Sequence, residues 1–495
     1  MLFNSATFLM FFPFVSLVYF LIPHRVRWAW LLLSSYVFYM SWNPKYAILL
    51  ATSTLITYAS GILIAKANEL RDREKATRMK KTWVALSLLS NLGILVLFKY
   101  IDFFGTNLIR LSLWLDLAIP IPNFNILLPI GISFYTFKAL SYTIDVYRND
   151  VEPETHLGRY ALFVSFFPQL VAGPIEKSKT FLHQFQEEHF FDYTRVRDGL
   201  LLMLWGFFQK VVVADRLAIL VNTVYNDPAS YRGFAIVIAT VFFALQIYCD
   251  FNSYSDIARG CAQVMGFRSS RNFGQPYLSR SIREFWANWH ITLCSWFKDY
   301  LYIPLGGNRC SKLRSYFNIF VVFVVSGIWH GATINFLIWG GLHGLYRVGE
   351  DLLRPLKDKL VRLLNIRTET LSMNLFQGFL TFSLVCFAWI FFRANTFSEA
   401  VLLLNNMLYF NPEIFTRGLI FELGLDWKEF IVALLGIFII ILGNIMQRTK
   451  RFGFDISEYH IGFRWTIYVT AIVFILVFGI YGPDFDAQQF IYLQF

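Results

Sequence analysis

The chain has 495 residues, of which 56% are hydrophobic, 19% aromatic and only 16% charged. A soluble domain does not need this much apolar surface, so the composition excludes a soluble globular protein and favours one that crosses a membrane many times. The formal net charge is +11, but the basic residues flank apolar stretches and form no continuous basic domain, which argues against a nucleic-acid-binding protein.

Apolar stretches near twenty residues in length recur along the chain and predict membrane-spanning helices. The clearest are Ala6–Ile22, Trp83–Phe103, Ile236–Cys249, Leu375–Phe392, Phe430–Met446 and Trp465–Tyr481. Including shorter and interrupted runs, we count roughly eleven to thirteen spans. No linker to a soluble domain is present, so we predict an all-α polytopic membrane protein, with one integral-membrane domain over residues 1–495 and a motif-bearing core at about 125–350.

Charge flanking the first spans predicts their orientation. The first apolar run has no basic residue before Arg25 and no small-residue cleavage site, so we interpret it as a span and not as a cleavable signal. Lys66–Lys81 carries seven Lys and Arg residues, and the positive-inside rule places it, as a loop over 66–82, in the cytoplasm. We therefore expect a multi-pass protein of the cell (inner or cytoplasmic) membrane with its N-terminus outside.

Proline and glycine interrupt two stretches in the middle of the chain. Residues 128–148 are broken near their start and continue as a helix with one polar face. Phe163–Ser178 is broken at Pro168 and at Gly173-Pro174, and is too short for a straight span. We predict a re-entrant segment there, because irregular backbone at membrane depth occurs only where protein or a water-filled cavity surrounds it.

Five charged residues lie beside or within apolar runs. Lys210 and Asp215 are too far apart around an α-helix to pair well, and we expect Asp215 and Arg216 to bond neighbouring segments instead. Asp250 and Asp256 follow directly on an apolar span. Carboxylates this close to hydrocarbon should be paired or should line a cavity, and a structural role stays open beside a chemical one.

Two histidines stand in Val321–Tyr346, a run that is apolar for about one membrane thickness. A histidine inside hydrocarbon is a functional candidate by default. His330 lies in the middle of the run, whereas His343 should lie nearer an interface. In a straight helix the two would be about 20 Å apart. We therefore pair His330 with His290, which lies on an upstream segment.

The His290 segment also carries a cation and an aromatic wall. In a continuous helix Arg283, Trp286, His290 and Cys294 would fall along one face. An imidazole has a pKa near about 6.5 and can accept and return a proton at physiological pH. The alternative is that each histidine only forms a hydrogen bond between helices.

Other catalytic signatures are missing from the sequence. It contains no GxSxG, HExxH, P-loop or GxGxxG motif, and its five cysteines are scattered without a CxxC pair. We therefore expect no metal site and no tightly bound cofactor.

Several segments resemble the membrane-bound O-acyltransferase (MBOAT) family, and within it the membrane subunit of bacterial alginate and polysaccharide O-acetyltransferases. They are LPIGISFYTFKALSYTIDVYR (128–148), FVSFFPQLVAGPIEK (163–177), KVVVADRLA (210–218), DFNSYSDIARG (250–260), REFWANWHITLCSWFKDYLYIPLGGNR (283–309) and SGIWHGATINFLIWGGLHG (326–344). The resemblance implies helices and re-entrant segments around a central tunnel. It departs from the family pattern at Asn252-Ser253 and at Thr333-Ile334-Asn335.

The resemblance also implies which residues act. The WHG histidine falls on His330 as the catalytic base, and the FWxxWH histidine falls on His290 as a supporting residue. The residues expected at the tunnel or the substrate are Trp329, Trp286, Trp289, Asp250, Asp256, Arg283, Asn288 and Pro174.

The implied reaction is acetyl transfer from cytoplasmic acetyl-CoA to hydroxyls of an exported or cell-wall polysaccharide, directly or through a serine of an SGNH-type extracytoplasmic partner. The basic residues suggested for the CoA phosphates are Arg268, Arg271, Arg280 and Arg283. One alternative is D-alanyl transfer to teichoic acid from a carrier-protein thioester. Another is a proton-coupled transporter using His330 and Asp250, for which the sequence shows no inverted repeats.

Overall fold

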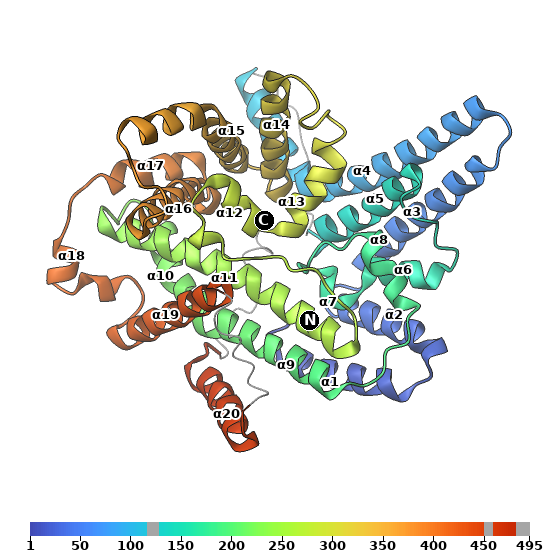
Figure 1. Cartoon of the computed structure of the whole chain (residues 1–495), viewed down its shortest axis with the longest axis horizontal. Helices are drawn as coiled ribbons and strands as arrows, with labels where there is room; N and C mark the ends of the chain where they lie inside the picture. Colours follow the sequence, from blue (N-terminus) through green and yellow to red (C-terminus); the bar gives the residue numbers. More distant parts are fainter. Residues whose placement is uncertain (116–127, 450–458, 482–495) are drawn as a thin grey trace. The chain divides into compact units, whose positions relative to one another are not determined.

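The computed structural model describes residues 1–115, 128–449 and 459–481, and within them all regular secondary structure is helical (Figure 1). The predicted all-α class is therefore confirmed. The backbone groups into two compact units. The first comprises residues 1–203 and 258–270, and the second comprises residues 204–257 and 271–495.

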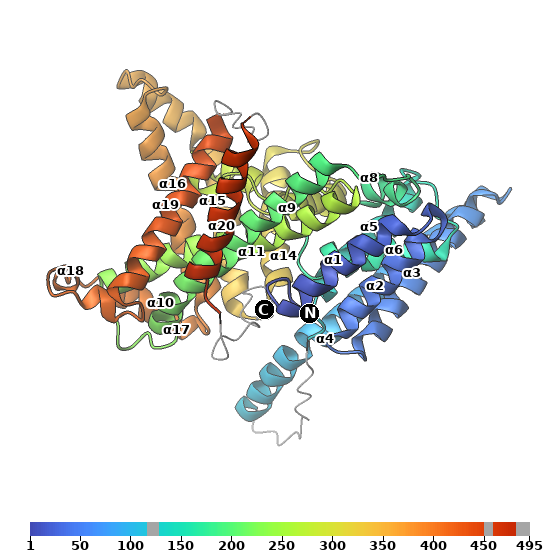
Figure 2. The ribbon, with the colours of Figure 1, turned by 90° about the horizontal axis from the view of Figure 1, so that it is seen from below.

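The first unit is built around the helices of the N-terminal third. Its elements are α1 (Ala6–Leu21), α2 (His24–Met40), α3 (Tyr46–Asn68), α4 (Arg73–Trp114), α5 (Ile132–Arg148), α6 (Leu157–Ser165), α7 (Phe167–Leu170), α8 (Ser178–Phe181), η1 (Leu182–Phe185) and most of α9 (Tyr193–Phe207). Helix α3 packs against α4, α5 and α6, as Figure 2 shows from below.

The basic stretch at 66–82 is not the loop that the sequence predicted. Helix α4 already begins at Arg73, and the Asp72 carboxylate accepts hydrogen bonds from the backbone N–H groups of Glu74 (2.9 Å) and Lys75 (3.1 Å). Lys, Arg and Glu are good helix formers, and a capped first turn lets them extend the apolar helix beyond the expected span. The connection between α3 and α4 is reduced to residues 69–72.

The 163–178 stretch is broken where proline and glycine predicted. Helix α6 ends at Ser165, α7 covers only four residues, and irregular backbone follows until α8. All residues from 160 to 176 except Ala161 are buried. The carbonyl oxygen of Leu170 leaves no room for a side chain at Gly131, whose φ is +75°. Protein thus surrounds the irregular backbone, and the re-entrant path through a membrane stays a prediction.

The second unit contains the histidine-bearing segments. Its elements are the end of α9, the π-helix η2 (Phe208–Ala214), α10 (Asp215–Tyr225), most of α11 (Phe234–Met265), η3 (Pro276–Leu278), α12 (Ile282–Asn288), α13 (Ile291–Phe297), the π-helix η4 (Lys298–Tyr302), α14 (Lys312–His330), α15 (Ile334–Leu363), α16 (Leu371–Arg393), α17 (Phe397–Met407), α18 (Glu413–Thr416), η5 (Leu419–Glu422), α19 (Trp427–Thr449) and α20 (Ile461–Phe478).

Helices α14 and α15 form a tightly packed hairpin (Figure 1). A Cβ atom on Gly327 would lie 2.2 Å from the carbonyl oxygen of Phe336, and one on Gly340 would lie 2.4 Å from that of Phe323. The two glycines therefore let the helix backbones touch. The apolar run Val321–Tyr346 is not one straight helix, because the chain turns back after His330.

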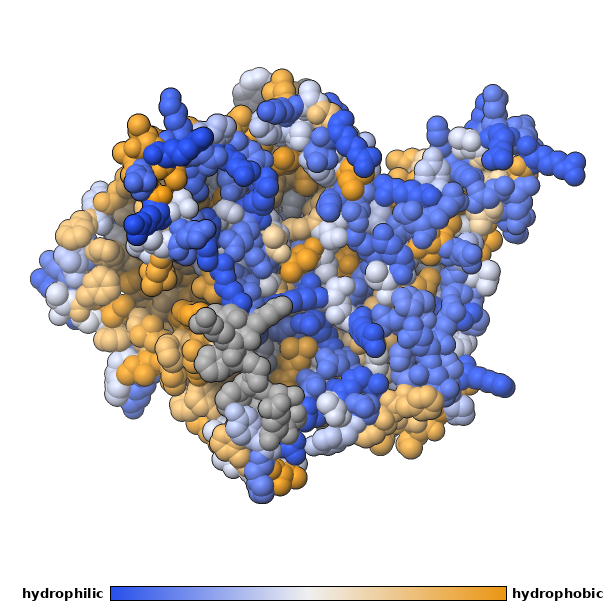
Figure 3. Space-filling model, in the orientation of Figure 1, coloured by the Kyte–Doolittle hydropathy of each residue, from blue (hydrophilic) through white to orange (hydrophobic). Residues whose placement is uncertain are grey.

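Seven described helices are long and apolar enough to cross a membrane: α3, the first part of α4, α11, α14, α16, α19 and α20. Helices α19 and α20 expose apolar side chains along much of their length, among them Phe438 and Trp465. Orange, hydrophobic surface covers the region of α19 in Figure 3. Such surface fits contact with lipid. The total of eleven to thirteen spans stays a prediction.

Candidate functional site

His330 lies at the tip of the α14–α15 hairpin, as the last residue of α14. Its ring centroid is 4.9 Å from that of Trp329, 5.0 Å from that of Trp339 and 5.5 Å from that of Phe392. Only 5% of the residue is exposed, which confirms that it is buried. The aromatic rings hold the imidazole in place, and the backbone after it is extended at Gly331.

His343 belongs to the same aromatic cluster as His330. It is fully buried, and its ring lies 5.0 Å from that of Trp339, which also contacts His330. The Trp286 indole N–H donates to its Nδ1 at 3.3 Å. The two histidines share Trp339 because the hairpin folds α15 back along α14 and does not continue as one straight helix. The depth of His343 in a membrane stays a prediction.

His290 does not continue the helix that precedes it. Helix α12 ends at Asn288, Trp289 is extended, and His290 has the left-handed φ of +43° before α13 begins at Ile291. The predicted single face from Arg283 through His290 to Cys294 is therefore wrong. A left-handed residue other than glycine costs free energy and persists only where its surroundings hold it.

A polar network holds His290 in this conformation. The Asn272 side-chain oxygen lies 3.0 Å from His290 Nδ1 and accepts from the Thr292 hydroxyl at 2.9 Å. The Asn272 amide nitrogen donates to Ser255 Oγ at 3.0 Å. Because an oxygen acceptor faces Nδ1, the proton of the neutral ring belongs on Nδ1 and the lone pair on Nε2.

Trp329 is a neighbour of both predicted catalytic histidines. Its ring centroid lies 6.2 Å from that of His290 and 4.9 Å from that of His330. The structure thus brings the two segments together around one indole. Direct cooperation between the two imidazoles stays a prediction.

Lys210 is the centre of a buried charge cluster. Its Nζ lies 2.8 Å from an oxygen of Asp215 and 2.5 Å from one of Asp250, and the three side chains are at most 4% exposed. The expectation that Lys210 and Asp215 cannot pair was wrong, because residues 208–214 form a π-helix. Its wider turn brings residues five apart to the same side. For Asp250, the prediction of an ion pair is confirmed.

Asp256 is also paired, six residues further along α11. It accepts from the side-chain amides of Gln209 (3.1 Å) and Asn252 (3.0 Å). The sequence suggested that Asp250 and Asp256 follow an apolar span. In the structure both lie inside the continuous helix α11. The side chains that bond them here, Lys210, Gln209 and Asn252, belong to the second unit, so both carboxylates have evident structural roles.

A cavity of about 290 Å³ lies beside the aromatic cluster, with Trp286 and Phe323 in its wall. Arg283, Lys298 and Arg347 supply positive charge to its lining. Asp351 bonds Arg283 at 2.9 Å and Arg347 at 2.8 Å, which neutralises part of that charge. Of the predicted tunnel residues, Arg283 and Trp286 line this cavity.

The other predicted tunnel residues have different positions. Trp289 stacks on Phe285 with ring centroids 5.5 Å apart and is 2% exposed. Asn288 accepts from the backbone N–H of Gly274 at 2.8 Å through its carbonyl oxygen. Pro174 is buried in the first unit, in the irregular stretch after α7. The positions of Trp289, Asn288 and Pro174 thus indicate roles in packing and in the path of the backbone.

Sequence reasoning missed Asn272, Trp339 and Phe392. Asn272 lies before η3 and α12, eighteen residues upstream of His290, and no spacing rule links the two residues. Trp339 lies four residues before His343, which is the spacing of neighbours on one helical face, and this signal was available. Phe392 comes from α16, which the sequence marked only as an apolar span, and its place beside His330 is a tertiary contact.

The arrangement suits proton transfer more than metal chemistry. His290 has an oriented imidazole, and His330 stands at a helix C-terminus, where the partial negative charge of the helix favours a protonated ring. Among the residues described, no three His, Cys, Asp or Glu side chains are grouped closely enough to hold a metal ion.

Comparisons with known proteins show the family to which the chain belongs. The chain is 38% identical over 402 residues to a probable alginate O-acetylase of Pseudomonas aeruginosa, covering 81% of this chain and 73% of the relative. It is 32% identical to a peptidoglycan O-acetyltransferase of Helicobacter pylori (83% and 80% covered) and 26% identical to a teichoic acid D-alanyltransferase of Bacillus subtilis (58% and 74%). Residues 37–397 match the model of the membrane-bound O-acyltransferase family. The chain therefore belongs to this family, and it is an O-acyltransferase.

Proposed function

We propose that the protein transfers an acetyl group from cytoplasmic acetyl-CoA for the O-acetylation of an exported or cell-wall polysaccharide. The observation that carries the proposal is His330 at the hairpin tip, buried among aromatic rings and sharing Trp329 with the oriented His290. The names of the relatives with 32% and 38% identity, both O-acetylases of polysaccharides, support the acetyl group and this class of acceptor.

In the proposed reaction His330 accepts the proton of the acceptor hydroxyl. The hydroxyl oxygen attacks the thioester carbonyl carbon and the C–S bond breaks. The CoA thiolate that leaves then takes the proton from the imidazolium of His330. The partial negative charge at the end of α14 stabilises the intermediate imidazolium. A positioned base of this kind contributes roughly 10²–10⁴-fold to the rate. His290 orients His330, or assists its proton transfer, through Trp329.

The acceptor is either the polymer itself or the serine of an SGNH-type extracytoplasmic partner that relays the acetyl group. We place the protein in the cytoplasmic membrane with its N-terminus outside, since Lys66–Lys81 then lies in the cytoplasm. Donor and acceptor are thereby on opposite sides, and the membrane protein supplies the passage between them.

The test uses membranes with matched amounts of wild type, His330→Ala and His460→Ala, supplied with radiolabelled acetyl-CoA. His460 is an exposed histidine at the start of α20 and serves as the control. We expect label in polymer or partner with wild type and His460→Ala, and a loss of at least about 100-fold with His330→Ala. Equal labelling by His330→Ala would remove His330 from the chemistry.

A second donor separates the proposal from its nearest rival. The D-alanyltransferase relative makes D-alanyl transfer the alternative. Label that enters polymer only from a D-alanyl carrier-protein thioester, and not from acetyl-CoA, would overturn acetyl transfer in favour of that reaction.

A further inference from the structure

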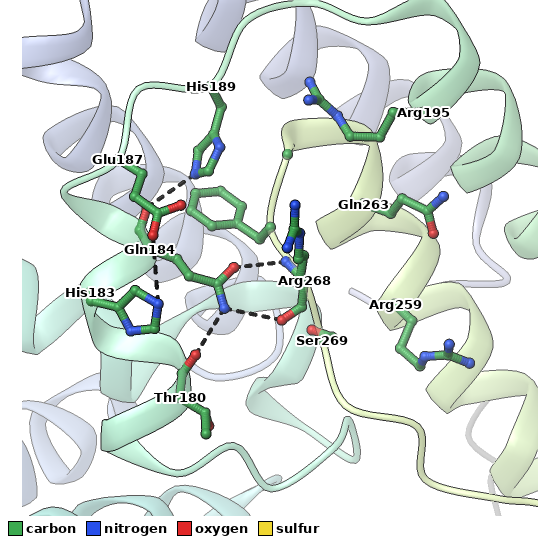
Figure 4. Close-up of a pocket in the computed structure, with 12 residues that line it drawn as sticks. Thr180, His183, Gln184, Glu187, His189, Arg195, Arg259, Gln263, Arg268 and Ser269 are labelled. Atoms are coloured by element: carbon green, nitrogen blue, oxygen red, sulfur yellow. Dashed lines mark hydrogen bonds and ion pairs between the residues drawn. The ribbon is translucent and has the colours of Figure 1, made fainter.

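The first unit contains a cavity of about 640 Å³ that the proposed chemistry does not use. Figure 4 shows its lining: Thr180 to Glu187 come from α8, η1 and the turn that follows, Arg195 from α9, and Arg259 and Gln263 from α11. The segment after α11 adds Arg268 and Ser269. The volume is in the range of sites that hold ligands of nucleotide size.

The lining carries excess positive charge. The lining contains three arginines, Arg195, Arg259 and Arg268, and one carboxylate, that of Glu187, which lies 3.5 Å from His183. Arg259 also interacts electrostatically with Glu176, which is outside the lining. Burial lowers the pKa of His189, so its imidazole is neutral at pH 7 and the charge comes from the arginines. Guanidinium groups bind phosphate oxygens with two parallel hydrogen bonds, which makes arginine the preferred residue for phosphate recognition.

The wall that holds Arg268 is fixed before any ligand binds. The Gln184 side chain accepts from the backbone N–H of Arg268 at 2.8 Å and donates to its carbonyl oxygen at 3.1 Å. Beneath it, Phe267 packs against Phe166 and Phe185, each with ring centroids 5.2 Å away. In Figure 4 the Arg268 guanidinium lies between Gln184 and Gln263. The backbone is rigid, while the Arg268 side chain is exposed and can reach a ligand.

Hydrogen bonds to the protein also hold Arg195 in the cavity wall. Its guanidinium donates to the carbonyl oxygen of Phe190, and its backbone N–H is capped by Asp192 at 2.6 Å. Two of the arginines suggested for the CoA phosphates, Arg271 and Arg283, lie outside this cavity and bond other side chains. Arg271 donates to the Gln447 side chain at 2.9 Å, and Arg283 to Asp351 at 2.9 Å.

The cavity lies on the side that we assign to the cytoplasm. The Arg27 guanidinium, in the first turn of α2, donates to the carbonyl oxygen of His189 at 2.6 Å, and His24 Nε2 lies 3.3 Å from that of Gln186. We predict that the α1–α2 connection lies on the same side of the membrane as the basic Lys66–Lys81 stretch, because two predicted spans, α2 and α3, separate them. A soluble cytoplasmic ligand therefore has access.

We propose that this cavity binds the phosphate-bearing end of the thioester donor through Arg195 and Arg268. The proposal rests on the proposed function, because that function supplies a donor with several phosphate groups. An anionic lipid headgroup offers the same phosphate chemistry, and the experiment distinguishes the two sources.

Binding is measured by calorimetry on the full-length protein in phosphatidylcholine nanodiscs, with adenosine 3′,5′-bisphosphate as the probe and adenosine as the uncharged comparison. We expect the bisphosphate to bind, and Arg195→Gln and Arg268→Gln each to weaken it by about 10- to 100-fold, as lost charge-assisted hydrogen bonds predict. Lys179→Gln is the matched control, because Lys179 is exposed beside the cavity without lining it, and it should change the affinity less than about two-fold.

The lipid source is tested in nanodiscs containing phosphatidylglycerol. Unchanged bisphosphate affinity supports a soluble ligand. Strong competition by phosphatidylglycerol that disappears in Arg268→Gln would refute binding of the donor and show that the cavity binds a lipid headgroup. Equal bisphosphate affinity in wild type and both arginine variants would overturn the site.

Transfer assays separate this proposal from the proposed function. Acetyl-CoA is compared with S-acetyl-pantetheine, which lacks the phosphates. If both proposals hold, the arginine variants lose activity with acetyl-CoA but keep that of wild type with acetyl-pantetheine. Bisphosphate binding that depends on the arginines, with no acetyl transfer from either donor, would retain the phosphate site and refute the acetyl-transfer function.

Discussion

The contact between α14 and α15 can be tested with one methyl group. In Gly340→Ala the new Cβ would lie 2.4 Å from the carbonyl oxygen of Phe323, whereas ordinary contact begins at 3.4 Å. The helices must therefore separate by about 1 Å, because both partners are backbone. The adjacent residue provides the control, since a Cβ on Gly341 meets nothing within 4 Å.

The expected magnitude follows from comparing the two variants. Each gains the helix propensity of alanine over glycine, about 1 kcal/mol, so this contribution cancels between them. What remains is the cost of overpacking, about 1–3 kcal/mol. We expect Gly341→Ala to be as stable as wild type or slightly more stable, and Gly340→Ala to be less stable than Gly341→Ala by that amount.

The assay is thermal unfolding in detergent, together with acyl transfer. Trp339 precedes Gly340 and contacts His330, so a separation of the helices should also lower the transfer rate in Gly340→Ala. Equal Tm and equal activity in the two alanine variants would refute the close packing of this hairpin.

Three further predictions concern buried polar groups. Lys210→Met leaves two buried carboxylates without their cation and should cost about 3–5 kcal/mol, whereas Asp215→Asn leaves one lysine–aspartate pair and should cost less; thermal unfolding of both compares them. Asn272→Ala removes the acceptor of His290 Nδ1 and should lower kcat with little change in KM and a shifted pH–rate profile; an unchanged kcat and profile would contradict a positioning role. Burial lowers the pKa of His189, so the unfolded chain binds a proton first as the pH falls, and stability should decline below about pH 6.5; this decline should be weaker in His189→Gln.

Local sequence patterns predicted the helices and breaks of the fold well. Hydropathy located α1, α16 and α19 closely, because apolar length alone defines such helices, and Gly173-Pro174 marked irregular backbone correctly. The errors came from assuming regular helices. The sequence shows no proline between Trp286 and His290, and the break there depends on Asn272 from another segment.

The same limit applies to the candidate site. His330 and His290 were identified from residue chemistry and from the family motifs, and their burial was expected. The aromatic surroundings contributed by α15 and α16 were not, because they depend on how the hairpin turns after His330. The Lys210–Asp215 pair was rejected on α-helical geometry, which does not hold in a π-helix.

The π-helix at Phe208–Ala214 also determines the register of the chain that follows. A π-turn corresponds to one extra residue in an α-helix, and one residue rotates a helix by about 100°. Deleting a single residue here would therefore turn α10 on its axis relative to α9. Arg216, which now donates to Glu429 at 2.5 Å and to the carbonyl oxygen of Phe478 at 2.8 Å, would face away from both. A one-residue deletion in this stretch should thus be far more harmful than any single substitution in it.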